Sequence, residues 1–135
     1  MTALETVHAF LETVFTPDGY QIDKIDDYIA ADCLFHDLPP GQQGREGYKG
    51  MLAMLSAATE EEGGAKQPVV FGAGEYVAVR WVNPLKHTGE LFGVPATGRV
   101  FTGIGHDLYR LRDGKIVEFW SVMDLAGIMR QLTAE

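Results

Sequence analysis

The spacing of apolar residues changes from helical to alternating about halfway along the chain. In the first half they recur every three or four positions, which is the period of an amphipathic helix. This spacing predicts a helix over residues 3–15, a second short helix over residues 22–29 and a third that starts near Arg45. Proline and glycine at residues 17–19 and 39–41 separate these helices.

The second half alternates apolar and polar side chains, as a half-buried sheet requires. The alternation begins at Val69 and Phe71 and passes through Val77, Val79 and Trp81. It continues over residues 100–110 and 115–123, with a tight hairpin at Gly114. The acidic run at residues 60–64 is predicted to be a solvated linker, and residues 125–132 a last short helix. Helices followed by antiparallel strands predict an α+β domain, with N-terminal helices packed on a curved, mostly antiparallel sheet.

Length and charge narrow the class of protein. A chain of 135 residues predicts a single domain, residues 1–135. The formal net charge of −8 argues against nucleic acid or an anionic membrane surface as a partner. The first twenty residues lack the positive region of a secretory leader, and a lone cysteine cannot form an internal disulfide. We therefore expect a cytoplasmic protein.

The metal-binding residue types are scattered rather than clustered. His8, His36, His87 and His106 are far apart, and no spacing typical of a metal site occurs, so no metal is predicted. His87 is expected to fix a loop by hydrogen bonding to nearby backbone. Cys33 has no cation among its sequence neighbours and is expected to be a small buried apolar residue rather than a nucleophile.

Asp124 is the leading candidate for chemistry. Its neighbours Val122, Met123 and Leu125 are apolar, and partial burial would raise the pKa of its carboxyl toward neutral pH, as a general acid/base requires. The competing hypothesis is that Asp124 caps the helix that begins at Leu125, which is a common position for aspartate. The sequence leaves both hypotheses open.

Three more polar residues are candidates for the same site. His36 could donate a hydrogen bond to a substrate carbonyl or share a proton with Asp124. His106 and Arg110 have the same parity in one predicted strand, so they point to the same side of the sheet. If that side faces a pocket, they would stabilise an oxyanion; if it faces solvent, they would have no special role.

Flat and flexible apolar side chains could hold a polycyclic ligand by stacking and exclusion of water. For each of them, ordinary core packing is the alternative. The candidates for substrate binding are Phe35, Tyr48, Met51, Trp81, Phe101 and Trp120.

Several short motifs occur in a recognisable order. They are Tyr28 to Asp32, His36, Gly44-Arg45-Glu46-Gly47, Phe92-Gly93-Val94-Pro95, Thr97-Gly98-Arg99, Glu118-x-Trp120 and Gln131-Leu132. In these motifs, and over almost its whole length, the chain resembles the SnoaL-like polyketide cyclase family. That family belongs to the nuclear-transport-factor-like superfamily of cone-shaped α+β domains, which hosts many functions.

The resemblance implies a bent sheet wrapped by helices around a deep apolar pocket, usually in a homodimer, with neither a metal nor an organic cofactor. It implies that the substrate is a hydrophobic small molecule and the reaction an intramolecular aldol condensation that closes the last ring of an aromatic polyketide. Asp124 would be the acid/base of that reaction, and His36 a residue of the pocket.

Other functions stay open beside the cyclase. Hydroxylation and isomerisation are the enzymatic alternatives within related folds. A non-catalytic module for ligand binding or dimerisation is the third. A filled interior, or Asp124 facing solvent as a helix cap, would favour the module.

Overall fold

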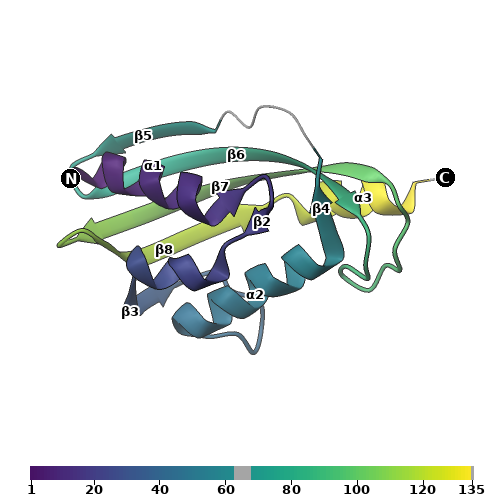
Figure 1. Cartoon of the computed structure of the whole chain (residues 1–135), viewed down its shortest axis with the longest axis horizontal. Helices are drawn as coiled ribbons and strands as arrows, with labels where there is room; N and C mark the ends of the chain where they lie inside the picture. The colour runs from purple at the N-terminus through teal and green to yellow at the C-terminus, as the bar shows by residue number, and fades with distance from the viewer. Residues whose placement is uncertain (63–67, 135) are drawn as a thin grey trace.

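A curved six-stranded sheet forms the centre of the computed structural model, which describes residues 1–62 and 68–134 (Figure 1). The strand order is β3-β8-β7-β6-β4, and β5 pairs with β6 beside that path. β3 runs parallel to β8, whereas the other pairs are antiparallel. The strands are β3 (Ile29–Phe35), β4 (Thr59–Glu61), β5 (Val69–Ala73), β6 (Tyr76–His87), β7 (Val100–Arg112) and β8 (Lys115–Met123).

Helices from the N-terminal half pack on this sheet, as the periodicity predicts. α1 begins at a capping box in which Thr2 and Glu5 each accept a hydrogen bond from the other's backbone N–H. α1 contacts β5 and β6, and α2 contacts β3. The remaining elements are α1 (Ala3–Val14), β1 (Phe15–Thr16), β2 (Gly19–Tyr20), the 3₁₀ helix η1 (Ile22–Asp27), α2 (Gly44–Ala58) and α3 (Leu125–Thr133).

The predicted α+β class is confirmed, but two local predictions are wrong. Residues 22–29 do not form one helix: η1 ends at Asp27, and β3 begins at Ile29. The carbonyl of Tyr28 already accepts a hydrogen bond from the N–H of Ile116, so pairing with β8 overrides the local helical pattern. In the predicted acidic linker, Thr59–Glu61 pairs with β6 as a strand, while residues 63 and 64 lie outside the described residues. None of the described helices is long and apolar enough to cross a membrane.

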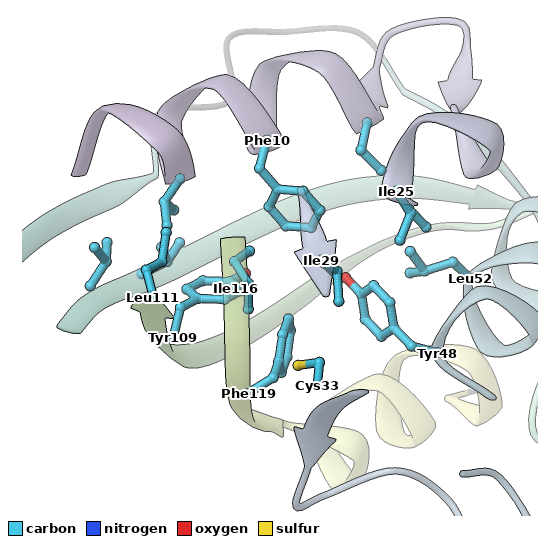
Figure 2. Packing of buried hydrophobic residues seen from close by; sticks show 14 residues of the cluster. Phe10, Ile25, Ile29, Cys33, Tyr48, Leu52, Tyr109, Leu111, Ile116 and Phe119 are labelled. Atoms are coloured by element: carbon cyan, nitrogen blue, oxygen red, sulfur yellow. The ribbon is translucent and has the colours of Figure 1, made fainter. Parts of the chain in front are cut away.

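The larger of two buried apolar clusters lies between the helices and the sheet (Figure 2). Its aromatic rings meet edge to face: Tyr109 lies 6.0 Å from Phe10 and 4.6 Å from Phe119 between ring centroids. Cys33 is buried in this cluster, as predicted, and burial raises the pKa of its thiol to about 12. A thiol in this state is a packing group and not a nucleophile.

Gly105 allows Trp81 to lie against the neighbouring strand. The two residues are register partners on β7 and β6. A Cβ atom at position 105 would overlap the indole ring of Trp81. The absence of a side chain at position 105 therefore determines where this ring lies.

We expect the substitution Gly105→Ala to lower the free energy of unfolding by about 1–3 kcal/mol, because the added methyl group overpacks the space that the indole fills. Chemical denaturation measures this change. Gly50→Ala in α2 is the matched control: its Cβ would have 3.7 Å to the nearest atom, and alanine in a helix should raise stability by about 0.5–1 kcal/mol. An unchanged midpoint for Gly105→Ala would contradict the close packing.

Candidate functional site

A cavity of about 520 Å³ lies between the helices and one face of the sheet. We call this face the inner face; it carries Val79 and Trp81 of β6, Asp107 of β7 and Ser121 of β8. Most of the cavity wall is apolar. Side chains from α1, α2 and the sheet contribute to it, among them Leu11, Phe15, Leu55, Val79, Phe119 and Met123.

The carboxylate of Asp107 is the charged group held by the inner face. Its Oδ2 accepts a hydrogen bond of 2.9 Å from the hydroxyl of Tyr109, and its Oδ1 accepts one of 2.6 Å from Ser121 Oγ. The side chain of Trp81 supplies a third hydrogen bond, for which the indole N–H is the donor. The three donors come from three adjacent strands, so the register of the sheet positions the carboxylate.

Burial raises the pKa of the Asp107 carboxyl above its ordinary value of 3.8. The hydrogen bonds from Ser121, Tyr109 and Trp81 act in the opposite direction, because they stabilise the ionised form. Desolvation is the larger effect. A carboxyl with a raised pKa that stays oriented by fixed donors is suited to accepting and returning a proton.

Four of the six predicted substrate-binding residues line the cavity, namely Phe35, Tyr48, Met51 and Trp81. The other two lie elsewhere. Phe101 is buried in the second apolar cluster, with Leu91 and Ile128 among its members. Trp120 lies on the opposite face of the sheet, which we call the outer face, where its ring stacks on His36 at 4.8 Å between centroids.

Asp124 lies outside the cavity. It is the N-cap of α3, and its Oδ1 accepts a hydrogen bond of 2.9 Å from the N–H of Gly127. Asp124 therefore occupies the helix-capping position that one of the two hypotheses gave it. Its apolar neighbours do not bury it, because Val122 and Leu125 are themselves exposed.

His36, His106 and Arg110 also lie away from the cavity. Strand parity places His106 and Arg110 on one side, as predicted, and that side is the outer face. There the Glu118 carboxylate accepts a hydrogen bond of 2.8 Å from Arg110 Nε through one oxygen, and its other oxygen lies 2.7 Å from His36 Nε2. These bonds, the one from Arg110 first, hold the pKa of the Glu118 carboxyl below its ordinary value.

Asp107 and its partners Tyr109 and Ser121 were not among the site residues predicted from the sequence. The signal was present in the alternation of β7, since the parity that puts His106 and Arg110 on one face puts Asp107 and Tyr109 on the other. Gly105 has that second parity as well, and Gly105 and Asp107 are the register partners of Trp81 and Val79 on β6. The alternation alone does not determine which face of the sheet lines the cavity.

His87 serves a structural role. His87 is fully buried at the end of β6, and its Nδ1 lies 2.8 Å from Thr97 Oγ1 and accepts the backbone N–H of Thr97. The loop-fixing role predicted for it is confirmed. Among residues 1–62 and 68–134, no group of three or more metal-ligating side chains is placed to hold an ion.

We expect Asp107→Asn to raise the free energy of unfolding at pH 7 by about 1 kcal/mol, since the amide removes a charge whose burial costs stability. The pKa of the Asp107 carboxyl is higher in the folded protein than its ordinary value of 3.8, which applies to the unfolded chain. The wild-type protein therefore loses stability as the pH rises from 3.8 through the folded-state pKa. The stability difference between variant and wild type should therefore shrink as pH falls to about 4. Urea denaturation between pH 4 and 8 measures it, and a difference independent of pH would contradict the burial of the charge.

Comparisons with known proteins identify the family of this chain. The sequence profile described as SnoaL-like polyketide cyclase matches residues 5–132. Aklanonic acid methyl ester cyclase DnrD from Streptomyces peucetius is 31% identical over 123 residues, which cover 85% of this chain and 83% of that protein. Nogalonic acid methyl ester cyclase from Streptomyces nogalater is 30% identical over 115 residues, covering 82% and 84%.

Solved structures align with this chain over nearly its whole length. Wild-type IdmH from Streptomyces antibioticus aligns with a TM-score of 0.77 at 28% identity, over 98% of this chain and 99% of that one. A SnoaL-like protein from Jannaschia sp. CCS1 aligns with a TM-score of 0.80 at 21% identity, over 98% and 92%, and shows the shared fold. Because the profile spans nearly the whole chain and the relatives match along most of their own length, this chain belongs to the SnoaL-like polyketide cyclase family.

Proposed function

We propose that this protein catalyses the intramolecular aldol cyclisation of an aromatic polyketide, with Asp107 as its acid and base. The observation that carries the proposal is the Asp107 carboxylate, buried in an apolar cavity and oriented by three donors. The two Streptomyces relatives are named as cyclases of acid methyl esters. A substrate of this chemical class supplies the acidic carbon and the carbonyl groups that the reaction needs.

The reaction requires one proton to leave carbon and one to reach oxygen. The ionised Asp107 takes a proton from a carbon between two carbonyl groups and leaves an enolate. The enolate carbon then bonds to a ketone carbon of the same molecule, and the π electrons of that ketone move to its oxygen. The protonated Asp107 returns its proton to this alkoxide, so the product is an isomer of the substrate and Asp107 is regenerated.

The shape of the cavity suits a flat and largely apolar substrate. Phe35, Tyr48 and Trp81 offer aromatic surfaces, and Met51 is a flexible wall. A volume of about 520 Å³ falls within the range of small-molecule sites. Holding the two reacting carbons together in such a cavity contributes to the rate independently of the proton transfer.

An open interior also bears on the non-catalytic alternative. Asp124, which the sequence favoured as acid/base, caps α3 and does not line the cavity, which by itself supports a module without chemistry. The interior, however, is open rather than filled, and it contains a different carboxylate with a raised pKa. This combination is typical of a catalytic site and favours the enzyme.

The proposed chemistry requires no metal and no organic cofactor, because a single carboxyl group moves the proton in both directions.

The cytoplasmic location expected from the sequence stays part of the proposal.

The outer face of the sheet supports the predicted homodimer. Large apolar side chains from four strands are exposed on it, namely Leu34 of β3, Phe71 of β5, Leu108 of β7 and Val122 of β8. Phe71 and Val122 are 65% and 69% exposed, and apolar patches of this kind mark contact surfaces. We propose that a second copy of the chain covers this face.

Replacing the two aspartates tests the assignment of the acid/base. Asp107→Asn keeps the shape of the side chain and removes its ability to take a proton, so kcat should fall by about 10²–10⁴. Asp124→Asn should leave kcat within about twofold, since asparagine caps a helix as well as aspartate does. Aklanonic acid methyl ester and nogalonic acid methyl ester are the substrates to assay first.

Product analysis by mass spectrometry and NMR completes this test. A cyclised product of unchanged mass supports the aldol reaction, whereas an added oxygen atom would indicate hydroxylation and an uncyclised isomer would indicate double-bond isomerisation. Unchanged turnover in Asp107→Asn, or a large loss in Asp124→Asn with intact folding, would overturn the assignment.

Sedimentation velocity tests the homodimer with two leucines of equal exposure. Leu108 lies on the outer face and Leu4 on α1, and each is 36% exposed. Leu108→Lys should convert a dimer to a monomer at micromolar concentration, because it places a charge in the apolar contact. Leu4→Lys should leave the dimer intact. A wild-type chain that sediments as a monomer would refute the proposed contact.

A further inference from the structure

We infer that the hydroxyl group of Tyr48 is the hydrogen-bond donor that stabilises the oxyanion of the reaction, an assignment that rests on the proposed function. The enolate formed by Asp107 and the alkoxide formed by ring closure both carry negative charge on oxygen. A donor aimed at this oxygen contributes strongly to the rate in a cavity that excludes water. Tyr48 would give a hydrogen bond to that oxygen and keep its own proton.

The Tyr48 ring is held in a fixed position. It projects from α2, is 4% exposed and stacks on Phe35 at 5.2 Å between centroids. Phe119 contacts it from the sheet at 5.1 Å. Figure 2 shows the ring extending from α2 with its hydroxyl at the end that points into the interior. A ring wedged between two aromatic neighbours presents its hydroxyl in one direction.

The hydroxyl of Tyr48 differs from those of Tyr109, Tyr28 and Tyr20. Tyr109 donates to Asp107, Tyr28 donates to Thr13, and Tyr20 accepts from Asn83. Tyr48 makes no hydrogen bond with any residue in the part of the chain that the structure describes. The Tyr48 oxygen is not among the fully enclosed polar atoms that lack a partner, although the residue as a whole is buried. Its hydroxyl is therefore open to the cavity that Tyr48 lines, where a ligand can accept its hydrogen bond.

Tyr48 and Asp107 share the same cavity. The charge of Asp107 also acts on Tyr48: together with the larger effect of burial, it raises the pKa of the phenol well above its ordinary value. The phenol therefore stays protonated at neutral pH and remains a donor. The base and the donor act on different atoms of one substrate, as proton abstraction next to a carbonyl requires.

Five other donors considered for this role are already in use or lie elsewhere. Ser121, Tyr109 and Trp81 direct their hydrogens to Asp107. The two residues that the sequence suggested as oxyanion stabilisers, His106 and Arg110, belong to the outer face. His8 and Tyr20 also line the cavity, but His8 is exposed and the Tyr20 hydroxyl already accepts a hydrogen bond from Asn83. Tyr48 is the donor that is held between aromatic rings and makes no hydrogen bond with a described residue.

Binding of a phenolate tests this role without any turnover. In the Asp107→Asn background, 2-naphthol mimics the enolate when ionised, and 2-methoxynaphthalene is its uncharged analogue. Adding Tyr48→Phe should weaken the binding of 2-naphthol by about 10- to 100-fold in calorimetric titration and leave 2-methoxynaphthalene within about twofold. The absorbance of bound 2-naphthol should also show a higher pKa in the double variant.

Tyr28→Phe is the matched control, because it removes a hydroxyl that bonds to Thr13 outside the cavity. It should leave the binding of both naphthalenes unchanged. Tyr48→Phe should unfold at the same denaturant concentration as wild type or a higher one, since it removes an unpartnered group. In the otherwise wild-type enzyme it should lower kcat by about 10²–10³ with little change in KM.

Equal losses for both naphthalenes, no loss for 2-naphthol, or no measurable binding of 2-naphthol to Asp107→Asn would overturn the role of Tyr48. These outcomes are separate from a failure of the proposed function, which is judged by turnover of the Asp107→Asn variant alone. If Tyr48 is the donor but Asp107 is not the acid/base, Tyr48→Phe weakens phenolate binding selectively and Asp107→Asn leaves turnover unchanged.

Discussion

The carboxylate of Asp107 in the cavity needs hydrogen bonds, and the surrounding strands are arranged so that they supply them. A charge in an apolar cavity is costly unless hydrogen bonds compensate for the water it loses. Tyr109, Ser121 and Trp81 supply these bonds from three neighbouring strands. Trp81 can do so because Gly105 leaves room for its ring. The sheet therefore serves as a frame that holds one ionisable group at a fixed place, and the helices close the cavity around it.

The fold class could be predicted from periodicity, whereas the position of the site could not. Helical and alternating spacings identify α1 and the long strands, because these elements each bury one face. In β7 the same alternation divides His106 and Arg110 from Asp107 and Tyr109. Which of the two faces meets the helices depends on tertiary packing, and polar residues on both faces leave no local signal. The start of β3 at Ile29 was missed for a related reason, since its pairing partner lies about 90 residues away.

Asp124 shows how sequence neighbours differ from spatial neighbours. Apolar residues on either side of an aspartate suggest burial, yet Val122 is 69% exposed and Leu125 is 44% exposed. At the junction of a strand and a helix the chain turns, so adjacent side chains point in different directions. Asp107 is the converse case. Its flanking residues His106 and Leu108 are exposed, whereas its partners Ser121 and Trp81 are distant in the sequence.

The two tryptophans lie on opposite faces of one sheet, Trp81 against the cavity and Trp120 stacked on His36. Indole fluorescence responds to local polarity and to nearby quenching groups, so the chain carries two optical reporters of separate events. Light emitted by Trp81 would follow the filling of the cavity, and light emitted by Trp120 would follow the covering of the outer face in the proposed dimer. Replacing either ring by phenylalanine would leave a protein in which a single emission band follows ligand entry or subunit association alone.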